Sequence, residues 1–125
     1  MDNSISIIIP GAVRIKKNSR RIYGFGKFKK SLPSEAYAEW EKQARADFIM
    51  NHRRFPVITT ECHVCATIFY KGQRPDLSGA MESIGDCLEG LVWENDRLIE
   101  SWDGSRLIKD NKNPRTVVVV EWEDI

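Results

Sequence analysis

The chain reads VITTECHVCATIFY over residues 57–70, KGQRP over residues 71–75 and DLSGAMESIGDCL over residues 76–88. The first stretch is rich in Val, Ile and Thr, which favours a β-strand. The second contains Gly and Pro and predicts a turn. In the third, apolar side chains recur at helical spacing and predict a helix over residues 77–88. A strand, a turn and a helix in direct succession indicate a chain that mixes both kinds of element.

Further elements flank this central unit. Residues 34–52 predict a helix, because Ser34 can cap it and apolar residues then recur every three or four positions. We expect strands over residues 4–9, 98–102 and 116–122, a polar connection over residues 106–115, and a long loop or ragged hairpin over residues 12–30 with short strands over residues 21–23 and 25–28. This order predicts an α+β fold, in which a small mixed β-sheet carries two main helices packed on one face.

Length and composition favour one domain over residues 1–125, with 42% apolar residues available for a core. The longest apolar stretches are far shorter than the ~20 residues that a membrane helix needs, so we expect no membrane partner. The first residues lack the basic and apolar regions of a signal peptide. Three cysteines do not make a disulfide scaffold, which indicates a reducing cytoplasm.

The near-neutral total of 19 basic and 18 acidic residues conceals two blocks of opposite charge. Residues 14–30 contain eight basic residues and no acid, whereas residues 76–103 contain eight acids and one base. A basic block predicts a polyanionic partner such as nucleic acid. A compact set of carboxylates predicts a hard divalent cation. The alternative is that both blocks are solvated surfaces.

Four carboxylates of the acidic block are candidate metal ligands. Asp76 begins the predicted helix, Glu82 and Asp86 follow on one helical face with Ser78, and Asp96 lies in the turn before the next strand. Carboxylates with water and substrate phosphate are the ligands of Mg²⁺, and Mn²⁺ is a substitute. Cys62 and Cys65 resemble half of a zinc site, but residues three apart on a strand point to opposite faces. Buried hydrophobic thiols are therefore the preferred interpretation of the cysteines.

Three segments of the acidic region resemble the RusA family of Holliday-junction resolvases. They are RPDLSG over residues 74–79, GDCL over residues 85–88 and GLVWENDRLI over residues 90–99. Weaker similarity covers IPG over residues 9–11 with the basic loop after it, and GSR, KD and NPRT near the C-terminus. The order of elements is similar over nearly the whole chain.

The resemblance implies a RusA-like fold and a homodimer that resolves four-way DNA junctions by paired Mg²⁺-dependent nicks in a bacterial cytoplasm, encoded by a phage or prophage. It matches Asp76 to the first motif Asp, Asp86 to the acid in the second half of the helix, and Asp96 to the Asp of the later turn. Three positions depart from the family pattern: Ser78 replaces Asp, Gly79 replaces Asn, and Glu82 replaces a catalytic Lys. Either Glu82 supplies the missing carboxylate, or the chain is a non-catalytic junction-binding recombination accessory protein that has lost part of its metal site.

The basic residues are candidates for DNA contacts through phosphates, which would recognise shape rather than sequence. The set comprises Lys16, Lys17, Arg20, Arg21, Lys27, Lys29, Lys30 and Arg74. The alternative for these residues is a loop that only increases solubility. A separate alternative for the function is a phage-encoded interaction protein with no nucleic-acid role. Trp40, Trp102 and Trp122 are candidates for a dimer interface, because they exceed what the core of a small monomer needs and aromatics are favoured at interfaces. The alternative is that all three lie in the core.

Overall fold

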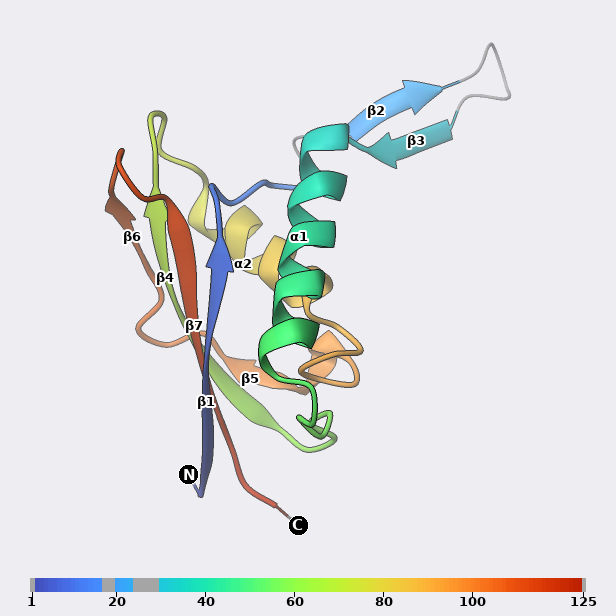
Figure 1. The fold of residues 1–125 in the computed structure, drawn as a ribbon, viewed down its shortest axis with the longest axis vertical. Coiled ribbons are helices and arrows are strands. Elements are labelled where there is room, and N and C mark those ends of the chain that lie inside the picture. Colours follow the sequence, from blue (N-terminus) through green and yellow to red (C-terminus); the bar gives the residue numbers. More distant parts are fainter. Residues whose placement is uncertain (1, 17–19, 24–29, 125) are drawn as a thin grey trace.

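The fold is organised around β7 (Arg115–Trp122), whose centre is a run of four valines. In a computed structural model, which describes residues 2–16, 20–23 and 30–124, β7 pairs antiparallel with β1 (Asn3–Pro10) on one edge and with β4 (Cys62–Tyr70) on the other. The far edge of β4 pairs in parallel with β5 (Ile99–Ser101) near its start and with β6 (Arg106–Lys109) near its end. The predicted α+β class and mixed sheet are confirmed (Figure 1).

Two helices pack on the same face of this sheet, as predicted. They are α1 (Glu35–Asn51) and α2 (Leu77–Cys87), and Figure 1 shows both on one side of the strands. Alternate residues along most of β4 and β7 are buried beneath them, as are Ile7 and Ile9 of β1. Ser34 caps α1 by accepting a hydrogen bond from the Tyr37 amide at 3.1 Å. Trp40 is only 6% exposed in this core, so the prediction that it lies at an interface is wrong.

A two-stranded hairpin, β2 (Arg20–Tyr23) with β3 (Lys30–Pro33), precedes α1 and extends away from the sheet (Figure 1). A hairpin within residues 12–30 was expected, but its second strand lies at residues 30–33 rather than 25–28. Residues 25–28 are outside the described part of the chain, as are Lys17, Lys27 and Lys29.

Three other boundaries differ from the sequence-based expectation. The strand predicted from residue 57 begins only at Cys62, because the segment before it contributes just one isolated bridge, between Ile58 and Trp93. The strand predicted over residues 98–102 is a short 3₁₀ helix, η3 (Asp96–Leu98), followed by β5. The polar connection predicted over residues 106–115 contains the strand β6. This strand pairs with β4 through backbone groups and most of its side chains are exposed, so its sequence shows no clear strand pattern. Among the described residues, no helix has the length and apolar character required to cross a membrane.

Candidate functional site

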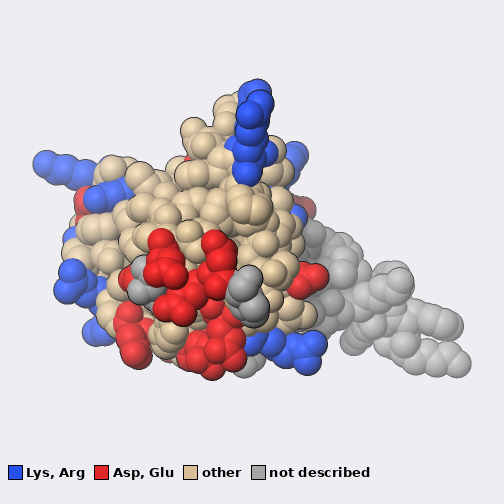
Figure 2. All heavy atoms as spheres, turned by 90° about the horizontal axis from the view of Figure 1, so that it is seen from below, with Lys and Arg blue, Asp and Glu red and all other residues tan. Residues whose placement is uncertain are grey.

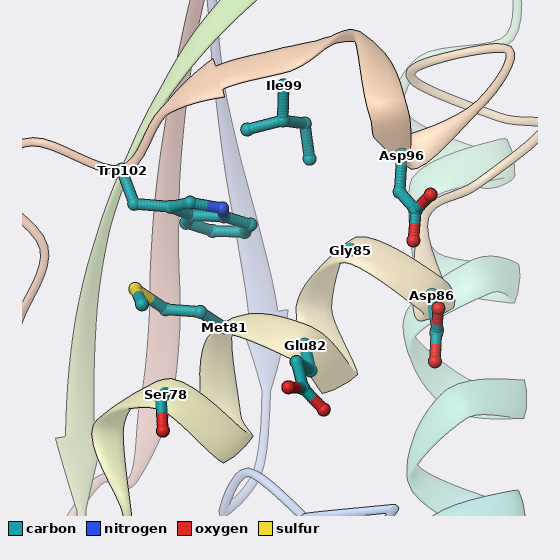
Figure 3. A pocket seen from close by; sticks show the side chains of 8 residues that line it. All are labelled: Ser78, Met81, Glu82, Gly85, Asp86, Asp96, Ile99 and Trp102. Carbon is teal, nitrogen blue, oxygen red and sulfur yellow. The ribbon is translucent and has the colours of Figure 1, made fainter.

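A pocket of about 400 Å³ lies between α2 and the segment that contains β5. Glu82 and Asp86 enter it from α2, and Asp96 enters from the start of η3. Figure 3 shows these carboxylates on one side of the pocket and an apolar wall on the other. That wall consists of Met81, Ile99 and Trp102, and Ser78 and Gly85 complete the lining.

The helix α2 places its two carboxylates by burying its opposite face. Its buried residues are Gly79, Ala80, Ser83, Ile84, Gly85 and Cys87. Ser78, Glu82 and Asp86, spaced by four residues, therefore lie together on the pocket side. The shared helical face predicted for these three residues is confirmed.

Asp96 is positioned by a turn that is fastened to α2. The Trp93 indole N–H is fully buried and donates to the Gly85 carbonyl at 2.9 Å. Gly90 adopts φ +84°, a conformation that favours glycine, and its amide donates to the Trp93 carbonyl at 2.7 Å. The Asp96 amide then donates to Glu89 Oε1 at 2.9 Å. This bonding holds the Asp96 carboxylate at the end of α2.

The carboxylates of Asp86 and Asp96 influence each other directly. Burial raises the pKa of Asp96, repulsion from Glu89 and Asp86 raises it further, and a hydrogen bond with Asp86 adds to the shift. A cation already lies on the other side of Asp86, where Lys16 Nζ is 3.6 Å from Oδ2. Asp86 and Asp96 thus concentrate negative charge, which the Lys16 ammonium partly neutralises.

Asp76 does not line this pocket. It is the N-cap of α2, and its Oδ2 accepts hydrogen bonds from the Gly79 amide at 3.1 Å and from Ser78 Oγ at 3.0 Å. Ser78 does line the pocket, so Asp76 reaches it only through the Ser78 hydroxyl. The structure therefore brings together Glu82, Asp86 and Asp96 but leaves the fourth predicted carboxylate behind them.

The donors of the pocket suit a hard cation in chemical type, since they are three carboxylates and the Ser78 hydroxyl, all oxygen ligands. In the described part of the chain, no three His, Cys, Asp or Glu residues are grouped closely enough to hold a metal ion together. Mg²⁺ commonly takes only one or two carboxylates and completes its shell with water and substrate phosphate. The neighbouring Asp86 and Asp96 fit such a two-carboxylate site.

The basic segment is attached to α2 beside the pocket. The Lys16 amide donates to Ser83 Oγ at 3.0 Å, and the Lys16 ammonium lies 5.7 Å from the centre of the Tyr37 ring. Ile15, the residue before Lys16, packs closely on Gly79 of α2. A Cβ at position 79 would lie only 2.9 Å from Ile15 Cγ2, so the absence of a side chain there allows this contact. Arg74 is exposed in the turn before α2. Arg20, Arg21 and Lys30 belong to the hairpin backbone described above.

Two of the three cysteines are buried thiols, as predicted, whereas Cys65 is only half-buried. Cys62 and Cys87 are fully buried in the core, and burial raises the pKa of Cys62 to about 11 and of Cys87 to about 12. Cys65, three residues after Cys62, lies on the opposite face of β4. The pair therefore diverges and forms no half-site.

Sequence reasoning missed two components of the site. Trp102 of the apolar wall was assigned to a dimer interface rather than to the pocket, although it ends a strand that the sequence predicts. The contact between Lys16 and Asp86 joins residues 70 positions apart and left no local signal.

No protein-family model matches this chain, and no curated protein is significantly similar to it. The resemblance to the RusA family therefore depends on the quoted sequence motifs alone.

Proposed function

We propose that this protein is a RusA-like, Mg²⁺-dependent endodeoxyribonuclease that resolves four-way DNA junctions by paired nicks. The observation that carries the proposal is the ion pair between Lys16 and Asp86, which joins the basic segment to a pocket lined by three carboxylates. Phosphate-binding charge and metal-binding charge are thereby adjacent, as hydrolysis of a phosphodiester requires.

Asp86 and Asp96 are the proposed Mg²⁺ ligands, with Glu82 facing the same pocket. When bound, the cation would lower the pKa of a water molecule and neutralise charge on the scissile phosphate. Lys16 lies beside Asp86 and can contact a phosphate oxygen in the same place. Asp76 positions α2 as its cap and holds the Ser78 hydroxyl at the pocket.

The charge distribution favours binding of DNA at the hairpin end of the molecule. Figure 2 shows the opposite end, where acidic side chains gather over the outer ends of β4 and β7. Glu61, Glu123 and Asp124 line a hollow there, and Glu121 is exposed next to them. These charges repel phosphate, so DNA approaches from the side of the basic segment and Arg74. We further propose a homodimer, encoded by a phage or prophage, that acts in the cytoplasm of a bacterial host.

The test is incubation of the protein with a labelled four-way junction, with and without Mg²⁺ or Mn²⁺. We expect paired nicks only with metal, and no nicks from Asp96→Asn. Glu94→Gln is the matched control, because Glu94 is exposed two residues away and does not line the pocket. Equal cleavage by Asp96→Asn and Glu94→Gln would exclude this site.

The second candidate function is a non-catalytic junction-binding recombination accessory protein. It is favoured by Ser78, Gly79 and Glu82, which depart from the family pattern, and by Asp76, which does not line the pocket. Tight junction binding without cleavage in either metal would support this function instead.

A further inference from the structure

The Lys16 side chain is kept beside the carboxylate pocket by contacts of both its backbone and its ammonium group. The backbone amide donates to Ser83 Oγ at 3.0 Å, and Ser83 is only 1% exposed, so this anchor lies on the buried side of α2. The ammonium lies 3.6 Å from Asp86 Oδ2 and 5.7 Å from the centre of the Tyr37 ring. Lys16 is therefore a fixed neighbour of Asp86 in the protein without DNA.

Asp86 is also one half of the two-carboxylate site. Its partner Asp96 enters the same pocket from η3, and the two carboxylates form a hydrogen bond and repel each other when both are ionised (Figure 3). A cation close to such a pair favours the form in which both groups are charged. In the structure Lys16 provides that positive charge at the position where Mg²⁺ would provide it in the loaded site.

The ammonium and a divalent cation compete for Asp86. A metal ion bound to this carboxylate would come close to Lys16 Nζ, and two like charges a few ångströms apart repel. The lysine side chain has a flexible stem, so its ammonium can turn away when another anion is near. A DNA phosphate is such an anion, because an ammonium binds phosphate oxygens by charge-assisted hydrogen bonds.

We infer that Lys16 makes metal binding depend on DNA: its ammonium neutralises Asp86 in the free protein, and it releases Asp86 to Mg²⁺ when a phosphate pairs with it. This role rests on the proposed function and adds an order of binding, in which DNA precedes the metal. Coupling between two ligands is reciprocal, so bound metal raises the affinity for phosphate by the same factor. The free protein would then carry little metal, and hydrolysis would be confined to bound DNA.

The experiment titrates Mn²⁺ into the protein without DNA and follows the indole N–H signal of Trp102 by NMR. Trp102 lines the pocket with Asp86 and Asp96, so paramagnetic Mn²⁺ bound there broadens this signal, which Trp102→Phe assigns. We expect Lys16→Gln to bind Mn²⁺ about fivefold more tightly than the wild-type protein, or about 1 kcal/mol, the interaction of two unit charges about 4 Å apart in water.

Two variants serve as controls for this effect. Lys42→Gln removes the same charge from an exposed position on α1 and should bind Mn²⁺ as the wild-type protein does. Lys16→Arg keeps a cation beside Asp86 and should also retain the wild-type affinity. A second titration adds an oligothymidylate, which supplies phosphates without a junction. It should tighten Mn²⁺ binding in the wild-type protein and in Lys42→Gln, and less so in Lys16→Gln.

The outcomes separate this role from the nuclease itself. Equal Mn²⁺ affinities of Lys16→Gln and Lys42→Gln in the absence of DNA would overturn the inference and leave the proposed cleavage untouched. So would an oligothymidylate that tightens Mn²⁺ binding equally in both variants. If Mn²⁺ broadens the Trp102 signal in none of the proteins, the metal site is absent, and the inference fails together with the proposed mechanism.

Discussion

Lys16 Nζ lies 3.6 Å from Asp86 Oδ2, while the Lys16 amide donates to Ser83 Oγ one turn earlier on α2. Both charged side chains are more than a third exposed, at 36% and 37%. An ion pair of that exposure contributes little to stability. Its consequence is positional, because the beginning of the basic segment is held against the carboxylate pocket.

The first prediction concerns this cation. Lys16→Gln should slow single-turnover cleavage of a junction by about 100-fold, the usual cost of removing one charge-stabilising donor from an active site. The free energy of unfolding should change by less than about 0.5 kcal/mol. Lys42→Gln, an exposed change on α1, is the control and should cut at the wild-type rate. Equal rates for the two variants would remove Lys16 from the mechanism.

The second prediction concerns the whole basic segment. Neutralising Lys16, Lys17, Arg20 and Arg21 together should reduce the slope of log affinity against log salt by up to about 3.6, because each lost phosphate contact removes about 0.9. Binding of the junction in a salt titration measures this slope. A control that neutralises Lys42, Arg53, Arg54 and Lys112, all exposed elsewhere, should leave the slope unchanged. The reverse result would place the DNA on another surface.

The third prediction follows from the raised pKa of Asp96. A carboxyl group whose pKa is raised in the folded state binds its proton more tightly there than in the unfolded chain. Its contribution to stability is complete below its ordinary pKa of about 4 and is lost as the pH rises through the raised pKa. At pH 7 the ionised group therefore opposes folding. Asp96→Asn should melt at a higher temperature than the wild-type protein at pH 7, and the difference should shrink toward pH 4.

The same variant should lose cleavage while gaining stability, which is typical of a residue retained for function. Glu94→Gln again serves as the control, with an unchanged melting temperature. A lower melting temperature for Asp96→Asn at pH 7 would show that the carboxylate stabilises the fold and would contradict the pKa argument.

The long elements could be predicted because their periodicity records burial. The stripe on α1 and the Val-rich run of β7 were both located correctly, since each buries one face in the core. Strand β6 was missed because it pairs through its backbone at the edge of the sheet while most of its side chains stay exposed. Edge strands of this kind carry little sequence signal.

Of the site, the sequence could predict only the part that lies on the single helix α2. Spacing by four residues correctly placed Glu82 and Asp86 on one face with Ser78. The position of Asp76 outside the pocket could not be foreseen. The side chain of a residue just before a helix can either cap the helix or point along it toward other side chains, and the sequence does not distinguish the two. Tertiary packing, which local patterns do not record, brings Trp102 to the pocket and Lys16 to Asp86.

The fourth prediction separates the two roles of Asp76. Asp76→Ala removes the N-cap and should lower the free energy of unfolding by about 1 kcal/mol, whereas Asp76→Asn keeps a good cap and should change it little. Because Asp76 lies outside the pocket, we expect Asp76→Asn to retain cleavage within about tenfold. A folded Asp76→Asn protein that does not cut would make Asp76 a metal ligand, as the family resemblance implies.

The last prediction concerns Gly79, where the family pattern has Asn. In an exposed helix, Gly→Ala would stabilise by about 1 kcal/mol. Here a Cβ would lie 2.9 Å from Ile15 Cγ2 and 3.2 Å from Asp76 Oδ2, so Ile15 must move. Gly79→Ala should therefore gain no stability, since overpacking costs about 1–3 kcal/mol.

Displacement of Ile15 should also pull the neighbouring Lys16 amide from Ser83, so junction affinity should fall with the loss of the anchored segment. Ile15→Ala removes the methyl groups that would clash with the new Cβ. The double variant Gly79→Ala with Ile15→Ala should therefore lose less junction affinity than the sum of the losses of the two single variants. Thermal melts and junction titrations of the four proteins complete the cycle. Additive effects would mean that Gly79 and Ile15 act independently and that the close approach does not anchor the basic segment.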